Sequence, residues 1–188
     1  MFIQTEQTPN PQTLIFLPGK VVMDEGTAFY QNIDQAEDSP FAIRLFGIDG
    51  VQGVFFGSDF ITITKKEEYD WQVMKPSILG GIIDHFNSDD ETVKQSNNKK
   101  SEKSNEKNKE DSEVVKQIKE LLDTRVRPAV AMDGGDIIYN DFEDGIVYLK
   151  MQGACSGCPS SPATLKMGIE NMLKHYIPEV QEVRPVDV

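Results

Sequence analysis

The sequence predicts an α+β protein of two small mixed domains joined by a disordered linker. Residues 88–112 hold one apolar residue, Val93, among polar and charged ones, and such a segment cannot bury enough surface to offset its ordering entropy. On either side, residues 1–87 and 113–188 each combine short strand-like runs with amphipathic helical runs. The 188 residues therefore divide into two domains and a spacer.

The first domain is expected to follow the order ββαββα. Ser39 and Pro40 have the chemistry of a helix cap and of a first helical residue. Apolar side chains recur at helical spacing from Trp71 to Phe86, but Pro76 interrupts them, so we expect this helix to begin at Pro76. The other expected elements are strands at residues 2–5, 13–17, 51–56 and 60–64 and a helix over residues 40–46.

The second domain is expected to follow the order αββαβ. Asp111 or Ser112 caps its first helix, and we expect Pro128 to limit the end of that helix. Asp133 and Asp136 enclose two glycines, a pattern more typical of a turn than of a metal or acid–base site. The expected elements are helices over residues 114–126 and 165–176 and strands at residues 137–140, 146–151 and 180–186.

Charge and hydropathy exclude two classes of partner. The chain has 19 Lys and Arg against 31 Asp and Glu, a net charge of −12, whereas nucleic acids and anionic lipid surfaces attract basic proteins. The longest apolar runs, such as Leu14–Leu17, contain four residues, and a transmembrane helix needs roughly 20. We therefore expect no nucleic-acid partner and no membrane association.

The N-terminal residues and the cysteine count bear on location. Residues Met1–Gln12 have neither the basic segment nor the apolar core of a secretory signal, and they lack the Arg and Ser of transit peptides. A first domain that begins within Met1–Thr8 leaves no room for a cleaved presequence. Two cysteines cannot form a disulfide framework. These features predict a reducing bacterial cytoplasm, with a mitochondrial matrix-type homologue as the alternative.

The chemistry of the chain is concentrated in its two cysteines, Cys155 and Cys158, which lie between a predicted strand and a predicted helix. The N-terminal end of a helix favours thiolate over thiol. Gly153 and Gly157 let the backbone approach a bulky inorganic ligand and leave N–H groups available to its sulfurs. Because Gly, Ser and Pro surround the pair, we expect both sulfurs to lie near the surface.

Several interpretations of the cysteine pair remain open at this point. Zinc and iron–sulfur clusters usually take four protein ligands, and the two histidines, His85 and His175, are poorly placed in the sequence to complete a site. A second copy of the chain could supply two more thiolates, either to an easily released cluster or to a structural zinc ion that bridges a dimer. The pair could also be a thioredoxin-like dithiol, although that motif belongs to a βαβ unit, or two structural cysteines packed under a helix.

Three motifs of the second domain occur together: Arg127-Pro128, Asp133-Gly134-Gly135-Asp136, and the run from Gly153 to Ser161 that contains both cysteines. Together they resemble the C-terminal domain of the NifU/Nfu family of iron–sulfur scaffold and carrier proteins. The first domain contains the run from Thr8 to Leu14, the pair Phe55-Phe56 and a helix with Trp71. These features resemble the Nfu N-terminal domain.

The resemblance implies a carrier, not an enzyme. A labile [4Fe–4S] cluster would be bridged between two subunits by Cys155 and Cys158 of each, so the chain would be a homodimer when cluster-bound. An upstream assembly scaffold would donate the cluster, and apo iron–sulfur proteins would receive it. A [2Fe–2S] cluster or iron alone is the alternative cargo. A dithiol reductase and a structural zinc-bridged dimer are the alternative functions.

Overall fold

A computed structural model of the chain describes residues 2–88, 90–93, 112–156 and 162–186. It divides into two compact units, residues 1–98 and 99–188, which are described separately below. Both units mix helices and strands, so the predicted α+β class with two small domains is confirmed. The expected linker boundaries stay a prediction, because residues 94–111 lie outside the described part of the chain.

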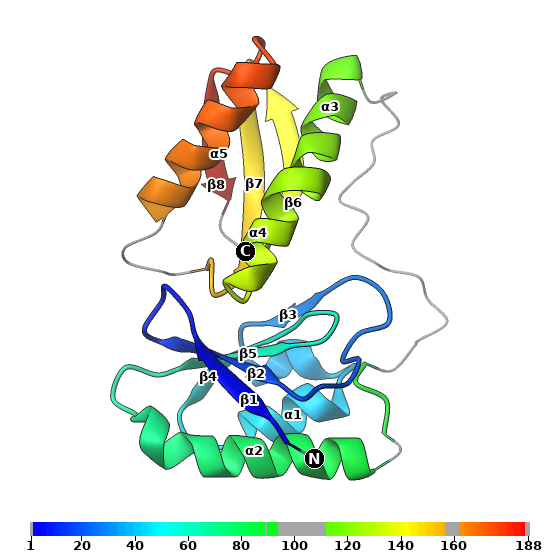
Figure 1. The fold of residues 1–188 in the computed structure, drawn as a ribbon, viewed down its shortest axis with the longest axis vertical. Coiled ribbons are helices and arrows are strands. Elements are labelled where there is room, and N and C mark those ends of the chain that lie inside the picture. Colours follow the sequence, from blue (N-terminus) through cyan, green and yellow to red (C-terminus); the bar gives the residue numbers. More distant parts are fainter. Residues whose placement is uncertain (1, 89, 94–111, 157–161, 187–188) are drawn as a thin grey trace. The chain divides into compact units, whose positions relative to one another are not determined.

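The first unit is an antiparallel sheet with its helices packed on one face (Figure 1). The strand order is β1-β2-β5-β4-β3. Side chains of both α-helices, among them Phe41 and Ile78, join Phe16, Phe56 and Ile63 of the strands in one core. The elements are β1 (Gln4–Gln7), β2 (Thr13–Leu17), β3 (Ala28–Tyr30), the 3-10 helix η1 (Ile33–Ala36), α1 (Pro40–Phe46), β4 (Val51–Phe56), β5 (Ile61–Lys65) and α2 (Trp71–Asn87).

The predicted order of the first unit is right except for one strand, and two predicted boundaries are wrong, since the first strand spans Gln4–Gln7 in place of residues 2–5 and α2 begins earlier than expected. The short strand β3 was not predicted, because three residues are too few to show an alternating pattern. Helix α2 begins at Trp71, not at Pro76, because the side chain of Asp70 accepts a hydrogen bond from Gln72 N at 2.8 Å and caps the helix there. Pro76 lies inside the helix, where it removes only one backbone donor near the N-terminal end.

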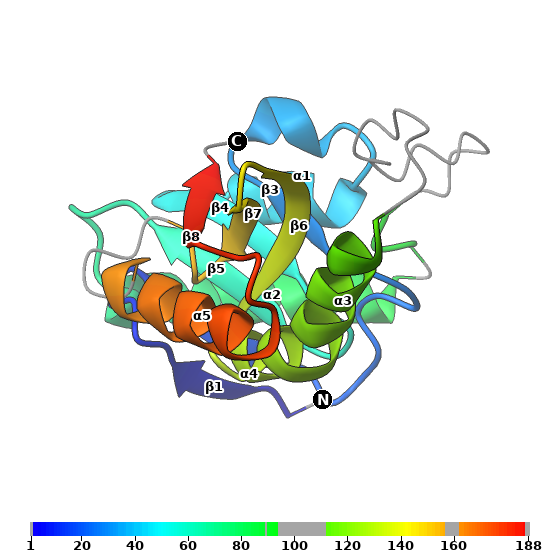
Figure 2. The same ribbon diagram turned by 90° about the horizontal axis from the view of Figure 1, so that it is seen from above.

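The second unit is a three-stranded sheet of order β6-β7-β8 whose helices also cover one face (Figures 1 and 2). β6 and β7 are an antiparallel hairpin, and β7 and β8 pair in parallel. Its core joins Ile118 and Leu173 of the helices to Ile137, Leu149 and Val183 of the strands. The elements are α3 (Glu113–Leu121), the π-helical turn η2 (Leu122–Val126), α4 (Arg127–Met132), β6 (Gly135–Glu143), β7 (Ile146–Gly153), α5 (Pro162–Tyr176) and β8 (Glu182–Val186).

The predicted order αββαβ is confirmed, but the first helix does not end where Pro128 predicts. The chain stays helical through the π-helical turn and continues as α4 to Met132. Pro128 is the second residue of α4 and directly follows the π-helical turn, where the regular i→i−4 bonding is already interrupted. The predicted cap is correct, since the Ser112 side chain accepts a hydrogen bond from Val115 N. No helix among the described residues is long and apolar enough to cross a bilayer.

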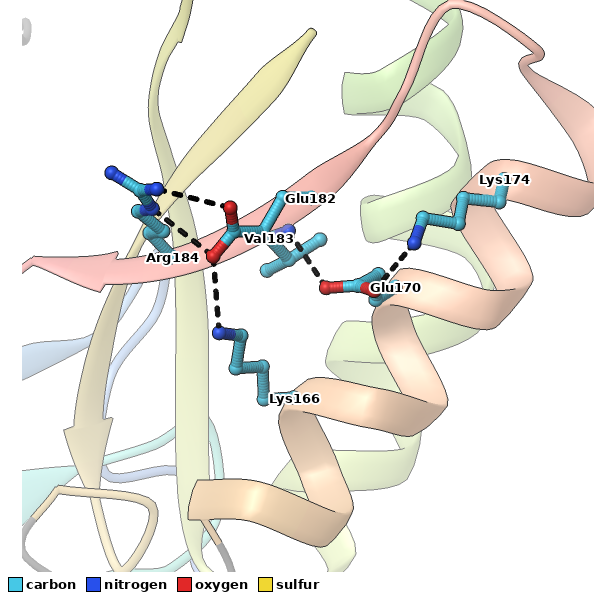
Figure 3. Close-up of polar contacts among 6 residues, drawn as sticks. All are labelled: Lys166, Glu170, Lys174, Glu182, Val183 and Arg184. Carbon is cyan, nitrogen blue, oxygen red and sulfur yellow. Dashed lines mark hydrogen bonds and ion pairs between the residues drawn. The ribbon is translucent and has the colours of Figure 1, made fainter.

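Charged side chains fasten α5 to the edge strand β8 (Figure 3). Glu170 of α5 accepts a hydrogen bond from the backbone N–H of Val183 at 3.1 Å and pairs with Lys174 at 2.6 Å. Glu182 of β8 pairs with Arg184 through two bonds of 3.1 and 3.0 Å and with Lys166 of α5 at 3.5 Å. Two of these contacts, Glu170 with Val183 N and Lys166 with Glu182, fix α5, the helix that follows the cysteine run, against the sheet.

Candidate functional site

Cys155 lies in a turn directly after β7, at one end of the second unit's sheet. The strand ends at Gly153, which pairs with Gly135 at the start of β6. Gly153 has φ 62°, a left-handed conformation that glycine adopts without strain. Two backbone bonds of 3.1 Å shape the turn, from Ala154 N to Gly134 O and from Ser156 N to Gly153 O. The cysteine turn, residues 153–156, is therefore held against the turn that precedes β6.

The Cys155 side chain is packed, not presented to solvent. It is 6% exposed and belongs to the hydrophobic core of its own unit. A Cβ atom on Gly135 would lie 2.5 Å from Cys155 Sγ, so the sulfur rests where a side chain at residue 135 would have been. The expectation of a surface sulfur is thus wrong for Cys155. Its polar sequence neighbours do not decide its exposure, because the turn folds back over the end of the sheet.

The structure places only one of the two predicted ligands. Cys158 lies outside the described residues, so its distance from Cys155 stays undetermined. Helix α5 begins at Pro162, four residues after Cys158. The predicted position of the cysteine pair, between a strand and a helix, is therefore confirmed.

The predicted turn before β6 is present, and its second carboxylate is engaged in an ion pair. Asp133 and Gly134 make the turn, and Asp136 is 3% exposed. Arg127 donates to both oxygens of Asp136, from Nε and Nη2, each at 2.9 Å. These bonds raise the pKa of Arg127 above its ordinary value. An acid–base role for Asp136 therefore has no support, and Gly135 is the contact of Cys155 that sequence reasoning missed.

Neither histidine is seen to take part in a metal site with Cys155 among the described residues. His85 belongs to the first unit, where its ring stacks on Phe41 with centroids 3.8 Å apart, and burial lowers its pKa to about 4. His175 is exposed in the last turn of α5 and contacts the ring of Tyr176. Within the described ranges, no three His, Cys, Asp or Glu side chains are grouped so that they could hold a metal ion.

The helix that contains Trp71 and the run from Thr8 to Leu14 are in contact in the first unit, and the sequence alone did not predict this contact. The indole N–H of Trp71 donates to Pro11 O at 3.2 Å. Asn10 is buried, and its side-chain oxygen accepts from Gln12 N at 3.0 Å. Trp71 therefore anchors the proline-containing turn, and both motifs are explained as structural elements.

Comparison with protein families gives two matches that cover both units. Residues 3–89 match "Scaffold protein Nfu/NifU N terminal", and residues 118–184 match "NifU-like domain". A "NifU-like protein 4, mitochondrial" of Arabidopsis thaliana is 52% identical over 185 residues, which cover 97% of this chain and 65% of the relative. The human "NFU1 iron-sulfur cluster scaffold homolog, mitochondrial" is 53% identical over 187 residues, which cover 99% of this chain and 72% of the relative.

Among solved structures, a NifU-like protein from Saccharomyces cerevisiae is similar with a TM-score of 0.46 and 24% identity, covering 51% of this chain and 87% of that one. The human and Arabidopsis relatives, and others from Drosophila species, are all named mitochondrial. The expectation of a bacterial cytoplasm is therefore wrong, and the relatives point to mitochondria.

Proposed function

The chain belongs to the NifU/Nfu family of scaffold proteins, and from this premise we propose that it is a mitochondrial carrier of iron–sulfur clusters. Its cargo is a [4Fe–4S] cluster, held transiently by Cys155 and Cys158 from each of two copies and then transferred to apo-proteins. An upstream assembly scaffold supplies the cluster. The role is that of a carrier, with no turnover of a small substrate.

One observation carries the proposal. Cys155 lies in a glycine-rich turn at the end of β7, and the chain contains only one other cysteine, Cys158. A cluster of this kind usually takes four cysteine thiolates. Two copies of the chain supply that number, whereas one copy supplies half of it.

The division of the ligands between two copies favours release of the cluster. Cys155 Sγ is packed against Gly135 and its residue is 6% exposed, so we expect the sulfur to turn outward when it binds iron. Each copy contributes two ligands, so a target can displace them one at a time. In each exchange the incoming target thiol loses its proton and binds iron as thiolate, and the departing cysteine thiolate takes up a proton.

The ligand assignment is tested by anaerobic reconstitution of the protein with iron and sulfide. We expect Cys155→Ala and Cys158→Ala each to lower bound iron and sulfide at least about fivefold, because each removes two of four thiolates from the dimer. Ser156→Ala is the matched control and should bind as the wild type does. Unchanged cluster content in either cysteine variant would contradict the assignment, and tight zinc that resists transfer would favour a structural zinc-bridged dimer.

A further inference from the structure

We propose that Arg127 and Asp136 are positioning residues for the cysteine turn. Their ion pair fixes the Gly134–Gly135 segment, and Cys155 rests on that segment. This inference rests on the proposed function, because it concerns how the Cys155 thiol is presented to a cluster. The inference is tested by two readouts, and one of them uses protein without a cluster. The inference can therefore fail or succeed independently of cluster binding.

The ion pair has the geometry of a rigid clamp. Arg127 Nε and Nη2 each lie 2.9 Å from one oxygen of Asp136, so the two planar groups meet through two parallel bonds. Asp136 Oδ1 also accepts from Ile137 N at 2.8 Å, and Arg127 Nη1 donates to Asp123 at 3.1 Å. A planar two-bond contact fixes orientation as well as distance, and lysine cannot reproduce it.

The clamp connects the helices to the cysteine turn through a short series of contacts. Arg127 is the first residue of α4, and Asp136 is the second residue of β6. Asp136 follows Gly135 directly, and Gly135 is in contact with Cys155 Sγ. Gly134 O accepts the bond from Ala154 N. A displacement of Asp136 therefore reaches both glycines that shape the position of Cys155.

A local irregularity of the helix helps to aim Arg127. The π-helical turn Leu122–Val126 immediately precedes it. One additional residue in a helical turn redirects all following side chains by roughly 100° around the axis. Asp123, inside that turn, binds the same guanidinium as Asp136 does. The helix thus supplies both the direction of Arg127 and a second carboxylate that holds it.

The second unit contains a matched control for removal of such a clamp. Arg184 also makes two bonds to one carboxylate, that of Glu182, at 3.1 and 3.0 Å (Figure 3). Arg184 is paired with Tyr148 on β7, five residues before Gly153. At about 3.3 Å per residue it lies roughly 16 Å along the strand from the cysteine turn. Arg184→Gln therefore removes the same charge and a two-bond contact, in this case a solvent-exposed one, far from Cys155.

The first readout is the alkylation rate of Cys155 in the cluster-free full chain. Cys155 and Cys158 fall in one tryptic peptide, since no Lys or Arg lies between Lys150 and Lys166, so all variants are made in a Cys158→Ser background. We expect Arg127→Gln and Asp136→Asn to raise the rate of reaction with iodoacetamide about tenfold, because the packed thiol is released when the turn loosens. Arg127→Lys should restore part of the protection, and Arg184→Gln should stay within about twofold of the parent.

The second readout uses the cysteine-intact chain after reconstitution. We expect Arg127→Gln to change the cluster's absorption and Mössbauer spectra and to slow iron loss to a chelator, because the packed position of Cys155 then competes less with iron for the thiol; Arg184→Gln should leave both unchanged. Denaturation curves identify any variant that fails to fold. If Arg127→Gln is such a variant, Arg127→Lys and Asp136→Asn are compared with Arg184→Gln in its place. Alkylation rates and spectra that are equal in the Arg127 and Arg184 variants would overturn the inference. A wild-type chain that binds no cluster, but shows the alkylation difference, would overturn the proposed function and leave this inference standing.

Discussion

At the scale of a single residue, His85 is a buried histidine that the first unit keeps neutral. It is 3% exposed, and its ring nitrogen Nε2 lies 3.3 Å from Thr92 Oγ1. Burial, and secondarily the charge of Arg44, lower its pKa to about 4 from 6.5. The unfolded chain takes up a proton near pH 6.5, whereas the folded chain does so only near pH 4. The stability that neutral His85 contributes is therefore complete above pH 6.5 and is lost as the pH falls toward 4.

His85→Phe should remove this pH dependence while keeping a ring stacked on Phe41. Between pH 6.5 and pH 4 we expect the wild type to lose about 2 to 3 kcal/mol more unfolding free energy than the variant does. Urea unfolding followed by the fluorescence of Trp71, the single tryptophan, reports on this unit. His175→Gln is the exposed control and should follow the wild type. If the unfolding free energies of the wild type and His85→Phe changed with pH in parallel, the lowered pKa of His85 would be contradicted.

At the scale of an element, β8 is an edge strand whose outer side is protected. Glu170 accepts the hydrogen bond of Val183 N, and Pro185, two residues further along the same strand, has no N–H to offer. Exposed backbone donors on an edge invite pairing with another chain. The contact between α5 and β8 therefore has two roles: it holds the helix that follows the cysteines, and it prevents the sheet from extending at this edge.

Glu170→Ala should expose the Val183 donor. We expect a loss of about 1 kcal/mol in the unfolding free energy of the second unit, together with concentration-dependent association. Glu170→Gln, which keeps an acceptor oxygen, should restore most of the stability. Lys174→Ala removes only the exposed pair within the helix and should cost no more than about 0.5 kcal/mol. Sedimentation velocity and urea unfolding measure both effects, and a monomeric Glu170→Ala chain of unchanged stability would refute this role.

At the scale of the whole molecule, the pattern of the sequence was sufficient to predict the fold class and most helices and strands. The caps Ser39 and Ser112 and the strand Thr13–Leu17 are where local chemistry places them. Proline was the least reliable local signal. Pro76 and Pro128 both lie inside helical segments, because a side-chain cap in one case and a π-helical turn in the other outweigh the lost hydrogen bond.

The family could be predicted from the residues around the cysteines, but the environment of Cys155 could not. The spacing of Cys155 and Cys158 and the motifs around them indicate the family, and the relatives agree with it. The packing of Cys155 against Gly135, and the clamp of Arg127 on Asp136, join residues that lie 20 and 9 positions apart in the sequence. Local patterns carry no information about such contacts, so burial of the sulfur could not be predicted.

The measurement that tests the central proposal most directly is native mass spectrometry of the anaerobically reconstituted protein. We expect a species of two 21.1 kDa chains with one cluster, which separates into single chains when the cluster is removed. Each chain on its own provides only two thiols. A cluster-loaded species that is strictly monomeric would contradict the shared site.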